Sequence, residues 1–397
     1  MRILFITVGT GVGKGEEKIK SLAHGILSSI LQHNPDKVVF FGSEESKKTV
    51  EEIKKQYLEK EGKEFHKKKY EFVKIDDIDD FSDCYEKMEN RIKEYKKEEI
   101  IIDYTSGTKT MTTTAAIIAM LYQKKLFLTS GKRGENGIVA PGTEEIKQQN
   151  LYLAYDKYSL EKAKEAFNSY RYEDAKNYLK QIVAMKERKD YEEIVEAYSL
   201  WDKFEHEKAR EKMEKIKMDI LNKNKSFLGR LSKAKVREEF LIPDLLNNAY
   251  RRIEEGKYDD AVARLYRVIE MVAQYRLKAE HELNPSEIKW GDLEIKLKEQ
   301  KIMEKYEKKK DEKGIIRLSL NECYDLLKDL KDEVGKVAED KELKDLLKKR
   351  NFSILAHGIE PVSIEDANRL FNKAKEIAKK VLKNLDEYME ISEFSKL

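Results

Sequence analysis

Hydrophobic positions follow different spacings in the two parts of the chain. As far as residue 150, short runs of β-branched and aromatic residues alternate with stretches in which apolar residues recur at helical spacing. This alternation is typical of a parallel sheet with crossover helices, so we predict a Rossmann-like α/β domain. The expected strands are 3–8, 38–41, 71–75, 100–104 and 125–128.

A turn-rich segment stands near the end of this α/β domain. Asn136-Gly137 is a strong hairpin signal, because two-residue hairpin turns need positive φ angles that this pair adopts readily. We therefore expect 126–130 and 138–140 to pair as antiparallel strands. Pro141-Gly142 is expected to close the domain.

From Leu151 onward the apolar residues keep helical spacing almost without interruption, which predicts an all-α region without strands. Only Pro243, Pro285 and Pro361 break this pattern. Three parts are expected: an α/β domain at 1–150, a helical connector at 151–235 and an all-α terminal domain at 236–397.

One short pattern occurs twice in the helical region. Each copy follows a polar turn and has the spacing of one helix face, which indicates a helical hairpin. The offset between the copies far exceeds the roughly 34 residues of a tetratricopeptide repeat, so we expect two separate helix pairs rather than a solenoid. The copies are Tyr172, Ala175, Leu179 and Tyr258, Ala261, Leu265.

The composition limits the classes of protein that fit. Lysine and arginine (79) nearly balance aspartate and glutamate (76), so the net charge of +3 does not suit a nucleic-acid coat protein with a large basic face. Charged residues make up 39% of the chain, which is typical of thermophile surfaces and equally of solvated helices. Cys84 and Cys323 form neither a disulfide framework nor a zinc pattern, so both are expected to be structural.

Neither a membrane span nor a secretion signal is expected. No stretch approaches the roughly 20 consecutive apolar residues that a membrane helix needs. The first residues lack the basic start, apolar run and cleavage site of a signal peptide. We therefore expect a cytoplasmic protein that does not contact membranes.

A glycine-rich loop is expected at the carboxyl edge of the sheet. Gly9, Thr10 and Gly11 directly follow a strand, in the position where open α/β sheets bind ligands. Val8 and Lys14 stand where the P-loop and the dinucleotide fingerprint, respectively, need glycine. The ATPase and dehydrogenase interpretations are therefore weak.

A second polar loop, 105–110, follows the expected strand 100–104 and opens an expected helix at 111–122. Amides at a helix N-terminus, flanked by hydroxyls and a lysine, favour an anion, and hydroxyls also suit the ribose and base edges of a ribonucleotide. The alternative is that these hydroxyls only cap the helix. Two polar loops on neighbouring strand ends favour ligand binding over capping alone.

These loops give the first domain a family resemblance. The segments 7–11 (Thr-Val-Gly-Thr-Gly) and 103–111 (Asp-Tyr-Thr-Ser-Gly-Thr-Lys-Thr-Met) resemble the CRISPR-associated Rossmann-fold (CARF) sensors of type III CRISPR systems. Such domains dimerise and bind cyclic oligoadenylates across the dimer axis. The resemblance implies a cyclic oligoadenylate as allosteric activator, with the tetra-adenylate as the expected ring, and no cofactor. Slow cleavage of that ring by Thr10, Thr108 and Lys109 is a further implication. The residues expected at the ligand are Gly9, Thr10, Gly11, Ser43, Thr105, Ser106, Gly107, Thr108, Lys109, Arg133 and Gly134.

A second candidate site lies near the C-terminus. Seven steps of about 100° return almost to the same helix face, so a continuous helix would place Arg350 and His357 two turns apart on one side. Gly358 is then the expected helix stop. Arginine stabilises charge on a scissile phosphate and histidine transfers protons near neutral pH. This pair therefore suits metal-independent RNA cleavage by the adjacent 2′-OH.

Arginine and histidine at this spacing are often unrelated surface residues. Two resemblances to known families, one in this segment and one upstream, favour the catalytic interpretation. Arg350-Asn351 with His357 resembles the Arg-x4-6-His signature of HEPN nucleases, and 261–277 resembles a core helix of CARF-HEPN ribonucleases. The resemblance implies single-stranded RNA as substrate, Arg350, Asn351 and His357 as catalytic residues, and a homodimer in which both copies of the pair meet. Glu270 is expected to form an ion pair on its own helix, with a supporting role toward Arg350 as the alternative. The other histidines lack metal-ligand spacing, so no metal site is expected.

The predicted function is an activated endoribonuclease that leaves a 2′,3′-cyclic phosphate and a 5′-OH. Ligand binding at the sensor would favour one relative placement of the two protomers. Three alternatives remain. A CARF-regulated transcription factor would need a basic recognition helix, and a DNase would need acidic residues and lysine clustered around a metal. A non-catalytic helical scaffold would leave Arg350 and His357 dispensable.

Overall fold

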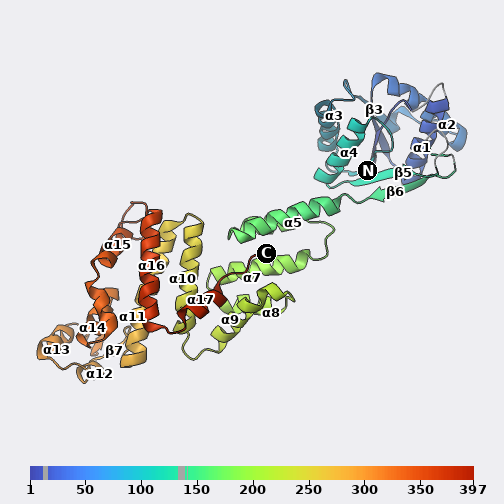
Figure 1. The fold of residues 1–397 in the computed structure, drawn as a ribbon. Helices are drawn as coiled ribbons and strands as arrows, with labels where there is room; N and C mark the ends of the chain where they lie inside the picture. Colours follow the sequence, from blue (N-terminus) through green and yellow to red (C-terminus); the bar gives the residue numbers. More distant parts are fainter. Residues whose placement is uncertain (12–16, 133–138, 141) are drawn as a thin grey trace. The chain divides into compact units, whose positions relative to one another are not determined.

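The computed structural model describes residues 1–11, 17–132, 139–140 and 142–397. The chain packs into two compact units (Figure 1). The first comprises Met1–Tyr158 with Ile182–Met185, and the second comprises Ser159–Gln181 with Lys186–Leu397. An α/β N-terminal domain followed by a helical region confirms the predicted fold class.

A six-stranded sheet forms the centre of the first unit, in the order β3-β2-β1-β4-β5-β6. The strands from β1 to β5 pair in parallel, and β6 pairs antiparallel with β5. Apolar β-branched and aromatic runs build the central strands, as buried parallel sheets require. The strands are β1 Arg2–Thr7, β2 Lys37–Gly42, β3 Tyr70–Lys74, β4 Glu99–Asp103, β5 Lys125–Ser130 and β6 Glu145–Gln149.

Helices cover both faces of this sheet (Figure 1). Alternate side chains of β1 point to opposite faces, so that Leu4 and Ile6 pack with α1 and α2, whereas Ile3 and Phe5 pack with α3 and α4. The sheet is therefore doubly wound. The helices are α1 Glu17–His33, α2 Lys47–Glu61, α3 Phe81–Glu94 and α4 Lys109–Leu121.

The antiparallel partner of β5 differs from the prediction. The structure pairs Ser130 with Glu145 and Leu126 with Gln149, so the partner strand is β6 and not 138–140. The Asn136-Gly137 turn signal and Pro141 lie outside the described residues. The chain returns to the sheet later than the turn residues suggested. Thr143 comes before the returning strand, and its hydroxyl accepts from the Lys132 amide just after β5, so the segment around Thr143 is held there before β6 begins.

The second unit is helical, with α11 at its centre. Helix α11 packs against α10, α14, α15 and α16, which explains its many fully buried apolar side chains. Helix α5 begins in the first unit and continues into the second. The helices after the sheet are α5 Tyr152–Asn168, α6 Tyr172–Lys180, α7 Arg188–Asp202, α8 His206–Glu214, α9 Asn222–Lys233, α10 Glu238–Glu254, α11 Tyr258–His281, α12 Trp290–Glu294, α13 Gln300–Glu307, α14 Leu320–Asp329, α15 Lys341–Asn351, α16 Ile364–Val381 and α17 Leu385–Ser392.

The two predicted hairpins are present, and a third has the same turn. Tyr172 and Tyr258 each begin a helix, two residues after Tyr170 and Gly256, whose φ angles are positive. Phe204, with a φ of 64°, likewise precedes α8 by two residues. In each turn an amide donates back to a carbonyl of the preceding helix, which satisfies that helix end. The sequence pattern missed the third copy because His206 replaces tyrosine at its first position and Met213 replaces leucine at its third.

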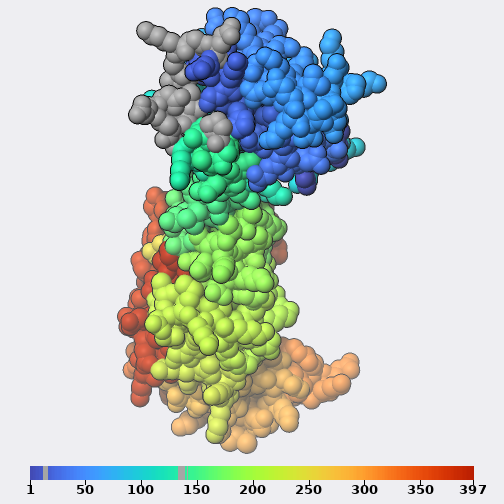
Figure 2. Space-filling view, turned by 90° about the vertical axis from the view of Figure 1, so that its right-hand side faces the viewer, coloured from blue at the N-terminus to red at the C-terminus, as the bar shows by residue number. Residues whose placement is uncertain are grey.

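Two predictions for the helical region were wrong. Pro243 does not break the helix pattern but lies inside α10, where it is buried beside Ile242 and Leu245. The packing of this apolar face outweighs the one hydrogen bond that proline removes. Two short strands also occur, β7 Ile288–Lys289 and β8 Ile315–Ile316, and they pair antiparallel. The segment between them forms a lobe that projects from the helical unit (orange in Figure 2). Among the described residues, no helix has the length and hydropathy needed to cross a membrane.

Candidate functional sites

The first site lies at the carboxyl edge of the sheet, between β1 and β4. The crossover from β1 leads through α1 to β2 on one side, and β4 lies on the other side of β1, so the strand order reverses at this point. Ligands of open α/β sheets bind at such a switch point, because the loops diverge there and leave a crevice. Gly9–Gly11 follows β1 and Thr105–Thr108 follows β4, which brings the two predicted loops together.

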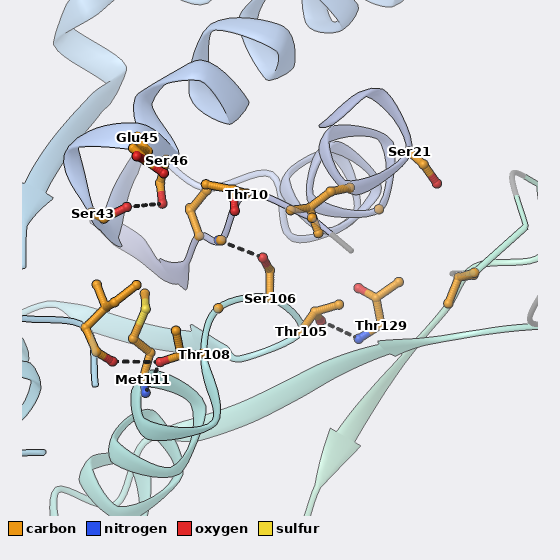
Figure 3. A pocket seen from close by; sticks show the side chains of 18 of the residues that line it. Thr10, Ser21, Ser43, Glu45, Ser46, Thr105, Ser106, Thr108, Met111 and Thr129 are labelled. Atoms are coloured by element: carbon orange, nitrogen blue, oxygen red, sulfur yellow. Dashed lines mark hydrogen bonds between the residues drawn. The ribbon is translucent and has the colours of Figure 1, made fainter. Parts of the chain in front are cut away.

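Hydrogen bonds hold these loops against each other (Figure 3). The Gly9 amide donates to the Ser106 hydroxyl at 2.9 Å, and the Thr49 hydroxyl donates to the Gly9 carbonyl at 2.8 Å. The Thr129 amide of β5 donates to the Thr105 hydroxyl at 2.7 Å. The second loop is therefore anchored on one side to the glycine loop and on the other side to β5.

Gly107 is required by the shape of this crevice. Its φ of 114° lies in the region that side chains rarely adopt. A Cβ there would also lie 3.3 Å from the side chains of Thr7 and Met111. The opposite glycine is equally close, since a Cβ on Gly9 would lie 3.2 Å from the Gly107 amide nitrogen. The loops approach each other closely because neither position carries a side chain.

Asp103, the last residue of β4, holds the second loop against the sheet through hydrogen bonds. Its carboxylate is buried and accepts from the Thr105 amide at 2.8 Å and from the Ser29 hydroxyl at 2.5 Å. Burial raises the pKa of Asp103, and these hydrogen bonds oppose that effect. The last residue of β4 thus has a structural role in supporting the crevice.

The crevice encloses a cavity of about 440 Å³. Among the predicted ligand residues, Gly9, Thr10, Gly11, Ser43, Thr105, Ser106, Gly107 and Thr108 line it. Lys109 is exposed and is not among the lining residues, and Arg133 and Gly134 lie outside the described residues. Further lining side chains that the sequence interpretation missed include Ser21 and Leu22 of α1, Glu45 and Ser46 after β2, and Leu128 and Thr129 of β5 (Figure 3).

Capping explains part of the second loop. The Thr108 hydroxyl accepts from the Met111 amide at 3.2 Å and donates to the Ile78 carbonyl at 2.7 Å, so it caps α4. By contrast, the hydroxyls of Thr10 and Ser21 line the cavity without a hydrogen bond to any described residue. The capping alternative therefore accounts for Thr108 and leaves the hydroxyls of Thr10 and Ser21 available to a ligand.

The second site lies where α15 ends. Helix α15 stops at Asn351, and 352–358 fold into a compact turn. The His357 amide donates to the Asn351 carbonyl at 3.1 Å, so the turn brings His357 back toward the helix end. The continuous helix considered from the spacing of Arg350 and His357 was therefore wrong, and the turn instead returns the His357 backbone to the end of α15.

Gly358 closes this turn rather than ending a helix. Its amide donates to the Ser353 carbonyl at 3.2 Å, and a Cβ at Gly358 would lie 1.9 Å from the Phe352 carbonyl oxygen. The Lys349 ammonium also donates to the Asp366 carboxylate at 2.7 Å, which ties the end of α15 to the start of α16. The segment that carries Arg350 and His357 is thus fixed at both ends.

The Arg350 guanidinium lies over the ring of Tyr266, with its central carbon 4.5 Å from the ring centroid. Its Nε atom is buried without a hydrogen bond, and its Nη1 atom donates at 3.3 Å to the Asn351 side chain. Among the described residues no carboxylate pairs with it. An aromatic face attracts a cation without occupying its N–H groups, so this arginine keeps donors for an anion. Tyr266, on α11, was not among the predicted site residues.

Two subsidiary expectations are settled by the contacts. Glu270 accepts from Arg267 at 2.5 Å and so forms the expected ion pair on its own helix. Cys84 and Cys323 are both buried and unpaired, as expected of structural cysteines.

Comparison with known proteins identifies the parts of the chain. The family model of the Csm6 HEPN domain matches residues 230–381, and that of the Csm6 6H domain matches 155–242. A model described as HFX_2341_N-like, N-terminal, matches 23–131. The solved structure of Enterococcus italicus Csm6 bound to cyclic hexa-2′-fluoro-hexa-dAMP is similar, with a TM-score of 0.62, 14% identity and coverage of 99% of this chain and 98% of that chain. No curated protein matches the sequence.

A doubly wound sheet domain with an open crevice, followed in the chain by a helical HEPN domain, defines the CARF-HEPN class. The chain belongs to the CARF-HEPN ribonuclease family of type III CRISPR systems. Within that family its 6H and HEPN domains are those of Csm6.

Proposed function

We propose that this protein is a cytoplasmic single-stranded RNA endoribonuclease that a cyclic oligoadenylate activates during type III CRISPR defence. The observation that carries the proposal is the Arg350 guanidinium, which is held over Tyr266 with its N–H groups free of carboxylates, next to a turn that returns His357. The membership of the chain in the Csm6 family supports the same activity.

The proposed chemistry needs no metal. His357 removes the proton from the 2′-OH, whose oxygen attacks the adjacent phosphorus, while Arg350 stabilises the added negative charge. The bond to the 5′-oxygen breaks, and a second histidine returns a proton to that oxygen. The products are a 2′,3′-cyclic phosphate and a 5′-OH. Asn351, which accepts from Arg350, orients the guanidinium.

The second histidine is proposed to come from a second copy of the chain. The turn beside Arg350 exposes Phe352 by 57%, Ile354 by 70% and Ile359 by 88%. Apolar side chains gathered at one exposed site mark a surface that another chain covers. A homodimer paired through this face would bring two copies of Arg350 and His357 together.

The crevice of the first unit is the proposed activator site. Its hydroxyls and loop amides suit the ribose and phosphate groups of a cyclic oligoadenylate, and the similar Csm6 structure holds an analogue of such a ring. Cyclic tetra-adenylate is the proposed ring. Slow cleavage of the activator would involve Thr10 and Lys109, with Thr108 engaged in capping α4.

Cleavage of a fluorophore-quenched RNA in EDTA, with cyclic tri-, tetra- or hexa-adenylate, tests this function. We expect cleavage with one ring only, and strongest with the tetra-adenylate. Ser106→Ala, which removes the acceptor of the half-buried Gly9 amide, should raise the half-maximal activator concentration about tenfold, since a hydrogen bond that holds the two loops together contributes about 0.5–1.5 kcal/mol. Thr113→Ala, on the exposed face of α4, is the matched control and should change nothing.

Absence of cleavage with every ring, from a folded dimer, would contradict the proposal. A protein that then binds duplex DNA would be a regulator, and one that cuts DNA only when a divalent metal is added would be a DNase. A protein that does neither would be a helical scaffold.

The contact between Tyr266 and Arg350 makes a separate prediction. Tyr266→Leu should lower kcat about tenfold with little change in KM, because a cation–π contact contributes about 0.5–2 kcal/mol to holding the guanidinium. Tyr266→Phe keeps the ring and should retain nearly full activity. Equal kcat for the leucine variant and the wild type would show that the ring does not position Arg350.

A further inference from the structure

A second hollow lies along α11, on the helical unit. It has a volume of about 490 Å³ and is bounded by the segment leading into α10, by one side of α11 and by the residues that follow α11. None of the three residues predicted as catalytic lines it. We call it the α11 groove; its charged and polar lining includes Lys235, Arg237, Arg267, Gln274, Lys278 and Ser286.

The α11 groove is basic. Lys235, Arg237, Arg267 and Lys278 line it, with Glu238 as the acidic lining residue. Lys278 lies 3.3 Å from Glu238, and Arg267 pairs with Glu270. Lys235 and Arg237 are exposed and make no ion pair with any described residue. This excess is local, because the chain as a whole has a net charge of only +3.

The α11 groove and Tyr266 of the candidate cutting site lie on the same helix, on faces turned by about 100° from each other. Tyr266, whose ring lies against the Arg350 guanidinium, directly precedes Arg267 in the sequence. Arg267 donates to Gln274 at 3.1 Å, and Gln274 lies about one turn before Lys278. At 1.5 Å per residue, Tyr266 and Lys278 are about 18 Å apart along α11, the length of a few nucleotides. A strand cut at Arg350 that bends around α11 would therefore reach this row of cations.

We propose that the α11 groove binds the sugar–phosphate backbone of the RNA strand beyond the scissile phosphate. This inference rests on the proposed ribonuclease function. Cations and amides bind phosphates without reading sequence, and the described lining holds no aromatic ring on which a base would stack. The groove thus adds affinity for longer RNA and confers no base preference.

The double variant Lys235→Ala/Arg237→Ala tests the groove, because removing two unpaired cations breaks no ion pair of the described residues. Its matched control is Lys215→Ala/Lys217→Ala, two exposed and unpaired lysines after α8. Binding of a fluorescent 20-nucleotide RNA is measured against salt concentration, with His357→Ala in every protein to prevent cleavage. We expect the groove variant to bind several-fold more weakly, with the slope of log K against log salt reduced by about 1.4. The control should match the parent protein.

Kinetics separate this proposal from the function on which it rests. In proteins with His357 intact, the groove variant should raise KM for the long RNA and leave kcat and the cleavage of a short RNA unchanged. Unchanged affinity and salt slope would overturn the groove as an RNA site even if the wild type cuts RNA. A change of oligomeric state in the groove variant would also overturn it, since the cations would then belong to a subunit interface. Groove-dependent binding by a wild type that never cuts would keep the groove and reject the nuclease.

Discussion

Arg350→Ala and His357→Ala are each expected to lower kcat for RNA cleavage by about 10²–10⁴-fold, the range that positioned proton transfer and charge stabilisation supply. Arg350, in the last turn of α15, has N–H donors without a carboxylate partner among the described residues, and no neighbouring cation of α15 is held over a ring in this way. His357 is exposed at the end of a turn fixed by its own backbone hydrogen bond. Both side chains are therefore expected to act on substrate and to contribute little to folding.

The controls distinguish chemistry from charge. Arg350→Lys keeps the positive charge but loses the planar fork of donors, so it should recover only a small part of the activity. His66→Ala, at another exposed histidine, should leave cleavage unchanged. The kcat values are measured under multiple turnover, with excess RNA and saturating activator. Retention of most activity by both alanine variants, with normal melting temperatures, would place the cutting site elsewhere.

Asp202→Ala is expected to destabilise the helical unit by about 3–5 kcal/mol, because it leaves the buried Arg251 without a carboxylate partner, whereas Arg252 keeps Glu255 at 2.9 Å. The Asp202 carboxylate, at the end of α7, accepts from Arg251 at 2.9 Å and from Arg252 at 2.7 Å. Those arginines are only 3% and 9% exposed. The side-chain amide of Asn248 also donates to Asp202, at 3.1 Å. One carboxylate thus joins the end of the connector helix to three side chains of α10.

Thermal unfolding measures this effect. A loss of this size should lower the melting temperature of the helical unit by about 6–20 °C, at about 2–4 °C per kcal/mol for a unit of this size. Asp202→Asn, which keeps one acceptor and loses the charge, should fall between the alanine variant and the wild type. Asp190→Ala, at an exposed acid in the first turn of the same helix, should stay within about 0.5 kcal/mol of the wild type. A melting temperature unchanged in Asp202→Ala would mean that the two arginines find other partners.

Local spacing predicted much of the sheet domain. The strands of the first unit and the helices between them follow from alternation of apolar runs, since burial on both faces demands it. The pairing of β5 with β6 did not follow, because Asn136-Gly137 indicates where a turn forms and not which later segment returns to the sheet. Pro243 likewise predicts a break in the helix when only the local sequence is considered. It lies inside α10 because the residues around it pack in the core.

For the candidate sites, the sequence by itself determined the two loops at the sheet edge and the Arg350, Asn351 and His357 motif, because glycines, hydroxyls and an arginine–histidine pair are local features with local chemical meaning. Only the tertiary structure decided what completes them. Ser21 and Thr129 reach the crevice from α1 and β5, and Tyr266 reaches Arg350 from a helix 84 positions earlier in the chain. Such residues carry no local signature, since their position depends on which elements pack together. Even the approach of His357 to the helix end was decided by a turn that ends α15, not by the helical period of its spacing.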